Sequence, residues 1–416
     1  MEYMDIISLV VLCATLIGAF LFKLNSGVIS ISVALILARI TGISDKELFS
    51  YFNSSLFVML FGVMLLFSIA QQNKTLELLA KKTLALCRGN TWVLPVVVFV
   101  FSAVFSAIGP GLISMTALMS VLVISLAKEM KMPAIRLAPF GLLGSFAGGL
   151  SPVTPTGIVA VNVSASSGIT GVAVPVALGM ALTCVLYALV LYVLFFIIRR
   201  NKTELAPRYI PTPSEPINYK QVLTLLGILA TCAVSTILNI NVGLVAIVVS
   251  VVLVLFRCAD EGAALKSIPW GTLIMITGVG ILISVVTGLG GIRLLENGLK
   301  SLSTDKTVSP IMTTLSGVMS WVSSASGVVM PTLIPTVPGI VSEMNSVSGS
   351  ELVSCISIGA NMAALSPLST CGGLMLAAYS TSGVTPKERN KMFVQLFALS
   401  ACAVLFSALL AFIGLY

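Results

Sequence analysis

The sequence predicts an all-α polytopic membrane protein made of two inverted five-crossing repeats, each with a re-entrant hairpin and a broken helix. Three observations predict this fold: an apolar composition, similar motifs at a near-constant offset, and matching interruptions rich in proline and glycine. Of the 416 residues, 57% are hydrophobic and 9% are charged, and the mean hydropathy is +1.09. Soluble domains carry about 25% charged residues. The apolar material suffices for about ten spans of about 20 residues, so the lipid bilayer is the expected surrounding.

The charged and sulfur-containing residues exclude several classes of function. The 23 Lys and Arg against 15 Asp and Glu give a net charge of +8, which in a membrane protein indicates basic cytoplasmic loops and not a nucleic-acid partner. The chain has no histidine, which excludes histidine metal sites and histidine-based catalytic triads. The eight cysteines are scattered without paired spacing, so no disulfide, resident metal or other cofactor is expected.

An internal duplication is indicated by motifs that recur about 216 residues apart. Asn25-Ser26-Gly27 matches Asn241-Val242-Gly243 at an offset of 216, and Leu150-Ser151-Pro152 matches Leu365-Ser366-Pro367 at 215. Between the halves lies a proline-rich, non-periodic stretch, which predicts a linker. We therefore expect a first repeat at 1–198, a cytoplasmic linker at 199–220 and a second repeat at 221–416.

The elements of each repeat follow in the same order. We expect long helices first, then a re-entrant hairpin, then a broken helix, at 1–71, 93–127 and 134–164 in the first repeat and at 221–287, 307–342 and 351–380 in the second. Runs 93–108 and 112–127 are separated only by Gly109-Pro110-Gly111, and basic residues flank both outer ends. Such flanks place both ends on one side of the membrane. The alternative is two complete crossings joined by tight turns.

The distribution of basic residues predicts the orientation. We expect the protein in the cell inner membrane with its N-terminus on the outer side. In that orientation, 18 of the 23 Lys and Arg lie on the cytoplasmic side and five on the outer side. The mixed leucine and charge patterns of Lys74–Arg88 and Gly291–Ser303 predict helices that lie in the membrane interface before each hairpin.

Two interruptions at 148–157 and 365–373 predict unwound segments near the middle of the membrane. Proline lacks an amide donor and clashes with the preceding turn, so each interruption frees backbone carbonyls and amides. Paired breaks at matching positions of an inverted repeat point to a transport site. The alternative is a pair of proline kinks whose polar groups neighbouring helices satisfy.

The expected ligand is an anion with a co-bound cation. No charged residue lies in the central part of any predicted span, whereas four half-helices begin near residues 112, 158, 328 and 373, and helix N-termini attract anions. Each such end contributes about 0.3–1 kcal/mol, which is too little to hold a dianion by itself. The freed carbonyls of Pro152, Val153, Pro367 and Leu368 are oxygen ligands suited to sodium, so Na⁺ is the expected coupling ion.

The opening MEYMDIISLVVL, the stretch from Leu24 to Lys82, and the motifs IGPG and AGGLSPVTPTGI resemble the MatC-type dicarboxylate carriers. More distantly, the paired hairpins and breaks resemble the divalent-anion/sodium symporters of the wider ion-transporter superfamily. The resemblance implies an elevator mechanism, in which the hairpins and broken helices move against a scaffold formed by the helices of 1–71 and 221–287, and it implies a homodimer formed through that scaffold.

Transferred to this sequence, the resemblance implies two sets of residues. The substrate set comprises Gly109, Pro110, Gly111, Thr154, Pro155, Thr156, Ser324, Ala325, Ser326, Ser369 and Thr370. The sodium set comprises Ser106, Gly111, Val153, Ser323, Ser326 and Leu368.

The sequence thus predicts a secondary transporter of small C3–C4 dicarboxylates such as malonate, succinate or malate, and not an enzyme. Three alternatives stay open: a carrier of another oxyanion or a monocarboxylate, a non-transporting membrane scaffold, and an intramembrane hydrolase. The hydrolase is least favoured because Ser151 and Ser366 have no base within the predicted spans.

Overall fold

The computed structural model describes residues 3–22, 24–78, 82, 92–130, 132–198, 216–238, 240–344 and 347–416. Every regular element in this part of the chain is helical. Most of the predicted linker and most of the predicted interfacial helix at Lys74–Arg88 lie outside the described residues.

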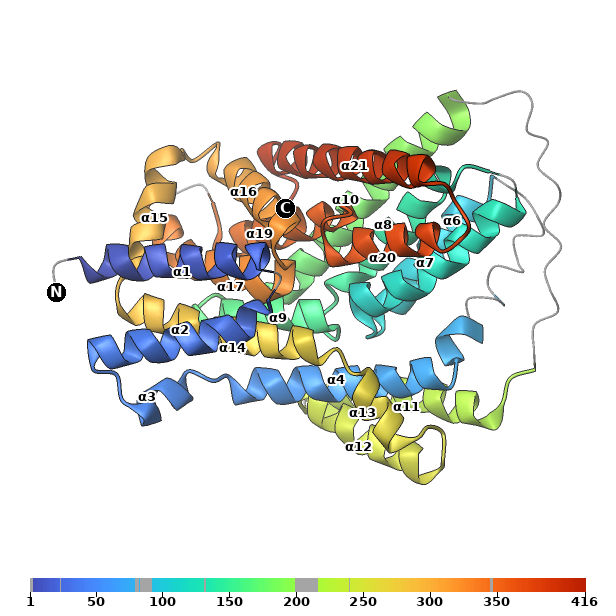
Figure 1. Ribbon diagram of the computed structural model, residues 1–416, viewed down its shortest axis with the longest axis horizontal. Helices are drawn as coiled ribbons and strands as arrows, with labels where there is room; N and C mark the ends of the chain where they lie inside the picture. The colour runs from blue at the N-terminus through green and yellow to red at the C-terminus, as the bar shows by residue number, and fades with distance from the viewer. Residues whose placement is uncertain are drawn as a thin grey trace.

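The first repeat consists of long helices, a helical hairpin and an interrupted helix, in the predicted order (Figure 1). Its elements are α1 (Met4–Leu21), α2 (Ser26–Thr41), α3 (Asp45–Ser50), α4 (Ser54–Gln72), α6 (Leu94–Ala107), α7 (Gly111–Glu129), η1 (Ala134–Arg136), α8 (Ala138–Gly149), α9 (Pro155–Ser166), α10 (Ala173–Tyr192) and the π-helical η2 (Val193–Ile198).

The second repeat follows the same order. Its elements are α11 (Tyr219–Leu238), α12 (Val242–Leu255), α13 (Glu261–Ser267), α14 (Trp270–Gly288), α15 (Gly291–Leu302), α16 (Val308–Val322), η3 (Ala325–Val329), α17 (Met330–Leu333), η4 (Ile334–Thr336), α18 (Val337–Glu343), α19 (Gly349–Met362), η5 (Ala363–Leu365), α20 (Thr370–Ser380) and α21 (Pro386–Phe412).

The two repeats cross each other through pairs of glycines. Helix α2 packs on α14, and α4 packs on α12. A Cβ placed on Gly62 would lie 2.0 Å from the Gly243 carbonyl oxygen, and one on Gly278 would lie 2.4 Å from that of Gly27. At the offset of 216, Gly243 is the repeat equivalent of Gly27, and Gly278 is that of Gly62. The contact between Gly62 and Gly243 is therefore equivalent to the contact between Gly278 and Gly27, as a two-fold relation between the repeats requires.

The second membrane-crossing helix of each repeat, α2 and α12, begins with an asparagine N-cap. The Asn25 side-chain oxygen accepts a hydrogen bond from the Gly27 amide at 2.9 Å, and that of Asn241 accepts one from the Gly243 amide at 2.9 Å. These asparagines therefore act as the N-caps that helix propensity predicts.

The buried apolar residues form one large core and two smaller ones. The large core contains residues of the hairpins and broken helices together with α10 and α21, which fill the upper part of Figure 1. The smaller cores are built chiefly from α1, α2, α4, α11, α12 and α14, most of which lie in its lower part. Helices far apart in sequence therefore pack together, while α4 and α6 belong mainly to different cores.

Seven helices of the described chain are long and apolar enough to span a membrane, and six shorter apolar helices accompany them. Large apolar side chains are exposed along their outer faces, including Ile17 (59%), Val248 (64%) and Leu405 (65%). This is the pattern expected of a polytopic membrane protein, whose lipid-facing surface is apolar.

The second arm of the hairpin predicted at 307–342 is not one regular α-helix. It begins as the π-helical η3, passes through α17 and the 3₁₀ segment η4, and continues as α18. Pro331, Pro335 and Pro338 each remove an amide donor from this arm, which explains why it cannot form one regular α-helix.

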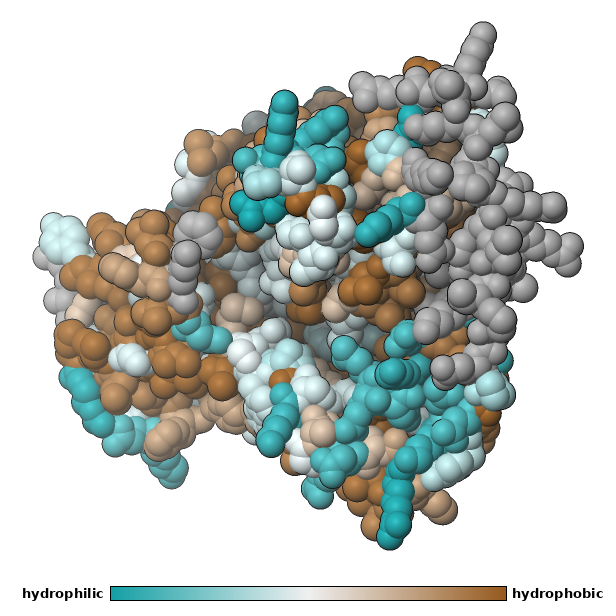
Figure 2. Space-filling model, turned by 45° about the vertical axis from the view of Figure 1, so that its right-hand side comes forward, coloured by the Kyte–Doolittle hydropathy of each residue, from teal (hydrophilic) through white to brown (hydrophobic). Residues whose placement is uncertain are grey.

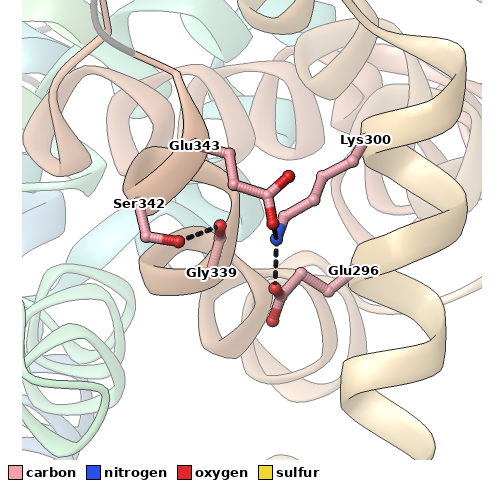
Figure 3. Close-up of polar contacts among 5 residues, drawn as sticks. All are labelled: Glu296, Lys300, Gly339, Ser342 and Glu343. Atoms are coloured by element: carbon pink, nitrogen blue, oxygen red, sulfur yellow. Dashed lines mark hydrogen bonds and ion pairs between the residues drawn. The ribbon is translucent and has the colours of Figure 1, made fainter.

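An ion-pair cluster joins the amphipathic helix α15 to the end of that arm (Figure 3). Lys300 Nζ lies 2.7 Å from Glu296 Oε1 and 2.8 Å from Glu343 Oε1. The hydrogen bonds that the Lys300 ammonium donates, first to Glu296 and then to Glu343, raise the pKa of Lys300 above its ordinary value. The carboxylates stabilise the charged form of Lys300, which is why its pKa is raised. The ion pairs are therefore present at neutral pH and are lost only as the pH rises through that pKa.

Candidate functional site

The two broken helices are interrupted by loops of nearly identical geometry. Thr154 Oγ1 donates to the carbonyl oxygens of Gly149 (2.7 Å) and Ser151 (2.8 Å). Ser369 Oγ donates in the same way to Ala364 (2.7 Å) and Ser366 (2.8 Å). These hydroxyls therefore tie the end of one half-helix to the start of the next.

A glycine closes each loop. A Cβ placed on Gly157 would lie 1.9 Å from the Ser151 carbonyl oxygen, and one on Gly372 would lie 2.2 Å from that of Ser366. A side chain larger than that of glycine would force the loop open. Both repeats therefore require glycine at this position, and the two glycines lie 215 residues apart.

The hairpin tips lie against the long helices of the repeats. Gly109 has φ 149° and Gly111 has φ 72°, a region of backbone space that favours glycine. A Cβ on Gly109 would lie 2.1 Å from the Phe67 ring of α4, and one on Gly327 would lie 2.5 Å from the Met275 side chain of α14. Each tip thus touches a helix of a smaller core through a glycine.

Four helices begin at this place, at Gly111 (α7), Pro155 (α9), Ala325 (η3) and Thr370 (α20), each within three residues of its predicted start. Thr154 Oγ1 accepts from the Gly157 amide at 3.2 Å, and Ser324 Oγ accepts from the Gly327 amide at 3.1 Å. The starts of α7 and α20 have no such side-chain cap. Their first amides and positive dipole ends are therefore free for a ligand.

A cavity of about 340 Å³ lies where the tips and breaks meet. It runs toward Gln71 at the end of α4 and Ser267 at the end of α13, and the corresponding face of the molecule is hollowed at its centre (Figure 2). None of the described residues that line it is charged. The polar side chains in its lining are those of Ser68, Gln71, Ser114, Thr156, Ser267, Thr272, Ser326 and Thr370.

Seven of the eleven predicted substrate residues line this cavity, namely Gly109, Pro110, Gly111, Pro155, Thr156, Ser326 and Thr370. The other four, Thr154, Ser324, Ala325 and Ser369, do not. The hydroxyls of Thr154, Ser324 and Ser369 make the local hydrogen bonds just described, so their side chains stabilise the tips and breaks.

The predicted sodium residues are less concentrated. Gly111 and Ser326 line the cavity, whereas the Ser106 hydroxyl donates to the Ser145 carbonyl oxygen at 2.6 Å and that of Ser323 to Met319 at 2.6 Å. Val153 and Leu368 lie in the break loops outside the cavity lining. No hydrogen bond from a described residue reaches their carbonyl oxygens.

Sequence reasoning missed the wall contributed by α4, α13 and α14. Phe67, Ser68 and Gln71 lie on one face of α4 and line the cavity. Ser68 Oγ donates to the Ala264 carbonyl at 2.6 Å and also contacts the Ser267 hydroxyl. Polar residues at 68, 71 and 72, in the last turns of an otherwise apolar helix, are the signal that would have indicated a hydrated face.

Comparison with known families decides the assignment. Residues 11–359 match the family model for citrate transporters, CitMHS. The chain belongs to the citrate transporter family. It is therefore a multi-pass membrane transporter and not an enzyme, and its broader assignment to the ion-transporter superfamily is confirmed. The finer resemblance to MatC-type carriers is not.

The fold of this citrate transporter family member is similar to that of another transporter. The crystal structure of the Alcanivorax borkumensis YdaH transporter, described as having an unusual topology, matches with a TM-score of 0.61 at 10% sequence identity, covering 90% of this chain and 89% of that chain. A search of curated protein sequences gives no match. The structural match supports the polytopic all-helical fold predicted from the sequence.

Proposed function

We propose that this family member is a secondary active transporter of C3–C4 dicarboxylates coupled to sodium. The observation that carries the proposal is a cavity with no charged side chain among its described lining residues. The starts of α7 and α20, which have no side-chain cap, place their first residues in this lining. Free amides and helix dipoles suit a carboxylate, and the hydroxyls of Thr156, Ser326 and Thr370 add neutral donors.

Sodium is the coupling ion that the electrostatics favour. Within the described part of the chain no arginine or lysine lines the cavity. Helix ends contribute only about 0.3–1 kcal/mol each, far less than the cost of dehydrating an unpaired charge. Two Na⁺ would neutralise a dianion. The carbonyls of Val153 and Leu368, which accept no hydrogen bond from the described residues, are suitable oxygen ligands.

An elevator movement is the mechanism that we propose. The hairpins and breaks share the large core, while the helices of 1–71 and 221–287 contribute mainly to the smaller cores. At Gly109 and Gly327 the tips approach the long helices without a side chain of their own, while Val328 beside the second tip packs into the smaller core with α14. The homodimer, the inner-membrane location and the external N-terminus are parts of the same proposal, with the cavity then open to the cytoplasm.

Citrate is the second candidate substrate, favoured by the family match at residues 11–359. A third carboxylate adds negative charge, so citrate transport would require more co-bound cation than dicarboxylate transport.

An uptake assay in proteoliposomes tests the proposal. We expect labelled succinate or malate to accumulate when an inward sodium gradient is imposed, and not with a potassium gradient of equal size. Accumulation of citrate but no dicarboxylate would select the second candidate. Uptake that ignores the sodium gradient would overturn the coupling, and no saturable uptake of any carboxylate would overturn the proposed function.

A further inference from the structure

A second cavity, of about 490 Å³, lies where the ends of α4 and α12 meet the starts of α11 and α13. These helices lie together in the lower part of Figure 1. The cavity shares no lining residue with the cavity at the tips and breaks, which we call the transport cavity. Its described lining is polar or charged except for Cys258 and Ala259. Small-molecule sites have volumes of about 300–1,000 Å³, so this cavity suits a small polar ligand.

Hydrogen bonds of carboxamide side chains hold the walls of this cavity together. Gln72 Oε1 accepts from the Asp260 amide at 3.1 Å, which joins the end of α4 to the start of α13. Gln221 Nε2 donates to the Asn73 carbonyl oxygen at 3.2 Å, and Asn73 Nδ2 donates to Thr224 Oγ1 at 2.7 Å, which joins α4 to α11. The fold itself therefore forms the cavity.

Two cations, Lys220 and Arg257, and one carboxylate, Asp260, line the cavity. Neither cationic side chain has a hydrogen bond or an ion pair among the residues that the structure describes. Asp260 Oδ1 accepts from the Ala263 amide at 2.8 Å and is the N-cap of α13. An anion in this cavity, which we call the cationic cavity, would therefore meet two cations without an existing partner in the described chain.

Arg257 has a backbone conformation that favours glycine. Its φ is 54°, its amide donates to the Val254 carbonyl oxygen at 2.8 Å, and the Cys258 amide donates to that of Leu253 at 2.9 Å. This is the turn with which many helices end, and its left-handed position is usually glycine. A residue with a Cβ is unfavourable there, so the turn itself does not account for an arginine.

The internal duplication places glycine at the same turn on the opposite face of the molecule. Gly42, which stands 215 residues before Arg257, ends α2 with φ 78°. Lys74, with φ 58°, is the other non-glycine residue of the described chain that has a positive φ, and it directly follows Asn73 of the cavity lining. Its equivalent at the offset of 216 is Gly290, with φ 86°. Both left-handed positions thus carry a cation only beside the cationic cavity.

The lysine of the cavity follows the same pattern. Lys220 stands 215 residues after Asp5, so the equivalent position on the opposite face is acidic. Basic loops are expected on the cytoplasmic side for topology alone. That rule does not select a position within a loop, however, and it does not explain cations at backbone positions that favour glycine.

The cationic cavity lies beside the mouth of the transport cavity. On α4, Gln71 lines the transport cavity and Gln72 lines the cationic cavity. Helix α13 runs between the two: Asp260 at its start lines the cationic cavity, and Ser267 at its end lines the transport cavity. From Asp260 to Ser267 the helix rises about 10 Å, so an anion in one cavity lies close to the entrance of the other.

We propose that the cationic cavity binds the transported carboxylate on the cytoplasmic side, with Lys220 and Arg257 as its charge partners. The identity of the anion and the side of the membrane rest on the proposed function. Cations on two separate segments suit an anion with two separate charged groups, as a dicarboxylate has. Because the protein supplies the positive charge here, this site needs no sodium, in contrast to the transport cavity.

Isothermal titration calorimetry of the purified full-length protein at low ionic strength tests this proposal. Succinate is titrated once in choline chloride and once in sodium chloride of equal concentration. We expect sodium-free binding by the wild type, and a Kd at least about tenfold higher in the double variant Lys220→Gln, Arg257→Gly. The sodium-dependent binding should remain in that variant. The control Lys46→Gln, Lys306→Gln removes two exposed charges elsewhere and should bind as the wild type does.

The single variant Arg257→Gly separates the role of the side chain from folding. It introduces the residue that Gly42 places at the equivalent turn, so its melting temperature should not fall below that of the wild type, while the sodium-free Kd should rise about threefold or more. An unchanged sodium-free Kd in this variant and in the double variant would overturn the proposal.

Three further outcomes would also overturn it: no sodium-free succinate binding by the wild type, loss of that binding in the Lys46→Gln, Lys306→Gln control, or tighter sodium-free binding of inorganic phosphate than of succinate. The last would assign the cavity to phosphate and not to the transported carboxylate. Absence of the sodium-dependent component alone would instead contradict the proposed coupling at the transport cavity, so the two failures are distinguishable.

Discussion

At the scale of single residues, the hydroxyls at this site divide into two groups. Thr154 is fully buried and bonded within its loop, whereas Thr370 is exposed and lines the cavity. The sequence presents both as threonines beside a break, and it cannot distinguish them because the distinction depends on where the carbonyl of Gly149 lies in space. A matched pair of substitutions can separate the two roles.

We expect Thr154→Val to destabilise the protein and Thr370→Val to weaken transport alone. Losing the Thr154 cap should cost about 1 kcal/mol and should lower the melting temperature in detergent, while Thr154→Ser should restore it. Thr370→Val should raise the KM for uptake several-fold with the melting temperature unchanged. A Thr370→Val protein that transports with wild-type KM would remove this hydroxyl from the proposed substrate site.

At the scale of elements, the interruptions are what the sequence predicts best. Proline and glycine act on their own helix, so the breaks and the tip at 109–111 are visible locally. The four helix starts lie within three residues of expectation. The α4 wall was missed because the polar residues at 68, 71 and 72 indicate a hydrated face of the helix but do not reveal that the hairpin tips meet it. Phe67 enters the site only because Gly109, from a different hairpin, packs on its ring.

The two tips should tolerate an added methyl group differently. Gly109→Ala places a Cβ 2.1 Å from the Phe67 ring at a positive φ of 149°, so we expect little folded protein or little uptake. Gly327→Ala meets the flexible end of Met275 at 2.5 Å without a positive φ, so a reduction of less than about threefold in uptake is expected. Gly280→Ala, with no atom within 4 Å, is the control. Equal effects at both tips would contradict this account of the Gly109 backbone.

At the scale of the whole molecule, the proposed mechanism requires the hairpins to move against the long helices, and a reversible cross-link can test this. Met275 Cγ lies 2.9 Å from the position of a Cβ on Gly327, so the Cβ atoms of a Met275→Cys, Gly327→Cys pair are within disulfide reach. Within the scaffold itself, Val249 Cγ1 lies 2.9 Å from the position of a Cβ on Gly227. Gly227→Cys, Val249→Cys therefore provides a control of the same geometry, with both cysteines on helices that stay together.

In a functional background without the native cysteines, oxidation of the Met275→Cys, Gly327→Cys pair should abolish sodium-driven uptake, and a reducing agent should restore it. The Gly227→Cys, Val249→Cys pair should cross-link with less than about twofold loss of uptake. The physical reason is that a disulfide fixes two Cα atoms within about 7 Å, which an elevator displacement between the large core and α14 would exceed, whereas α11 and α12 keep their contact throughout. Full uptake by a completely cross-linked Met275→Cys, Gly327→Cys protein would mean that the second hairpin stays on α14 during transport, and the elevator mechanism would then have to be abandoned for this protein.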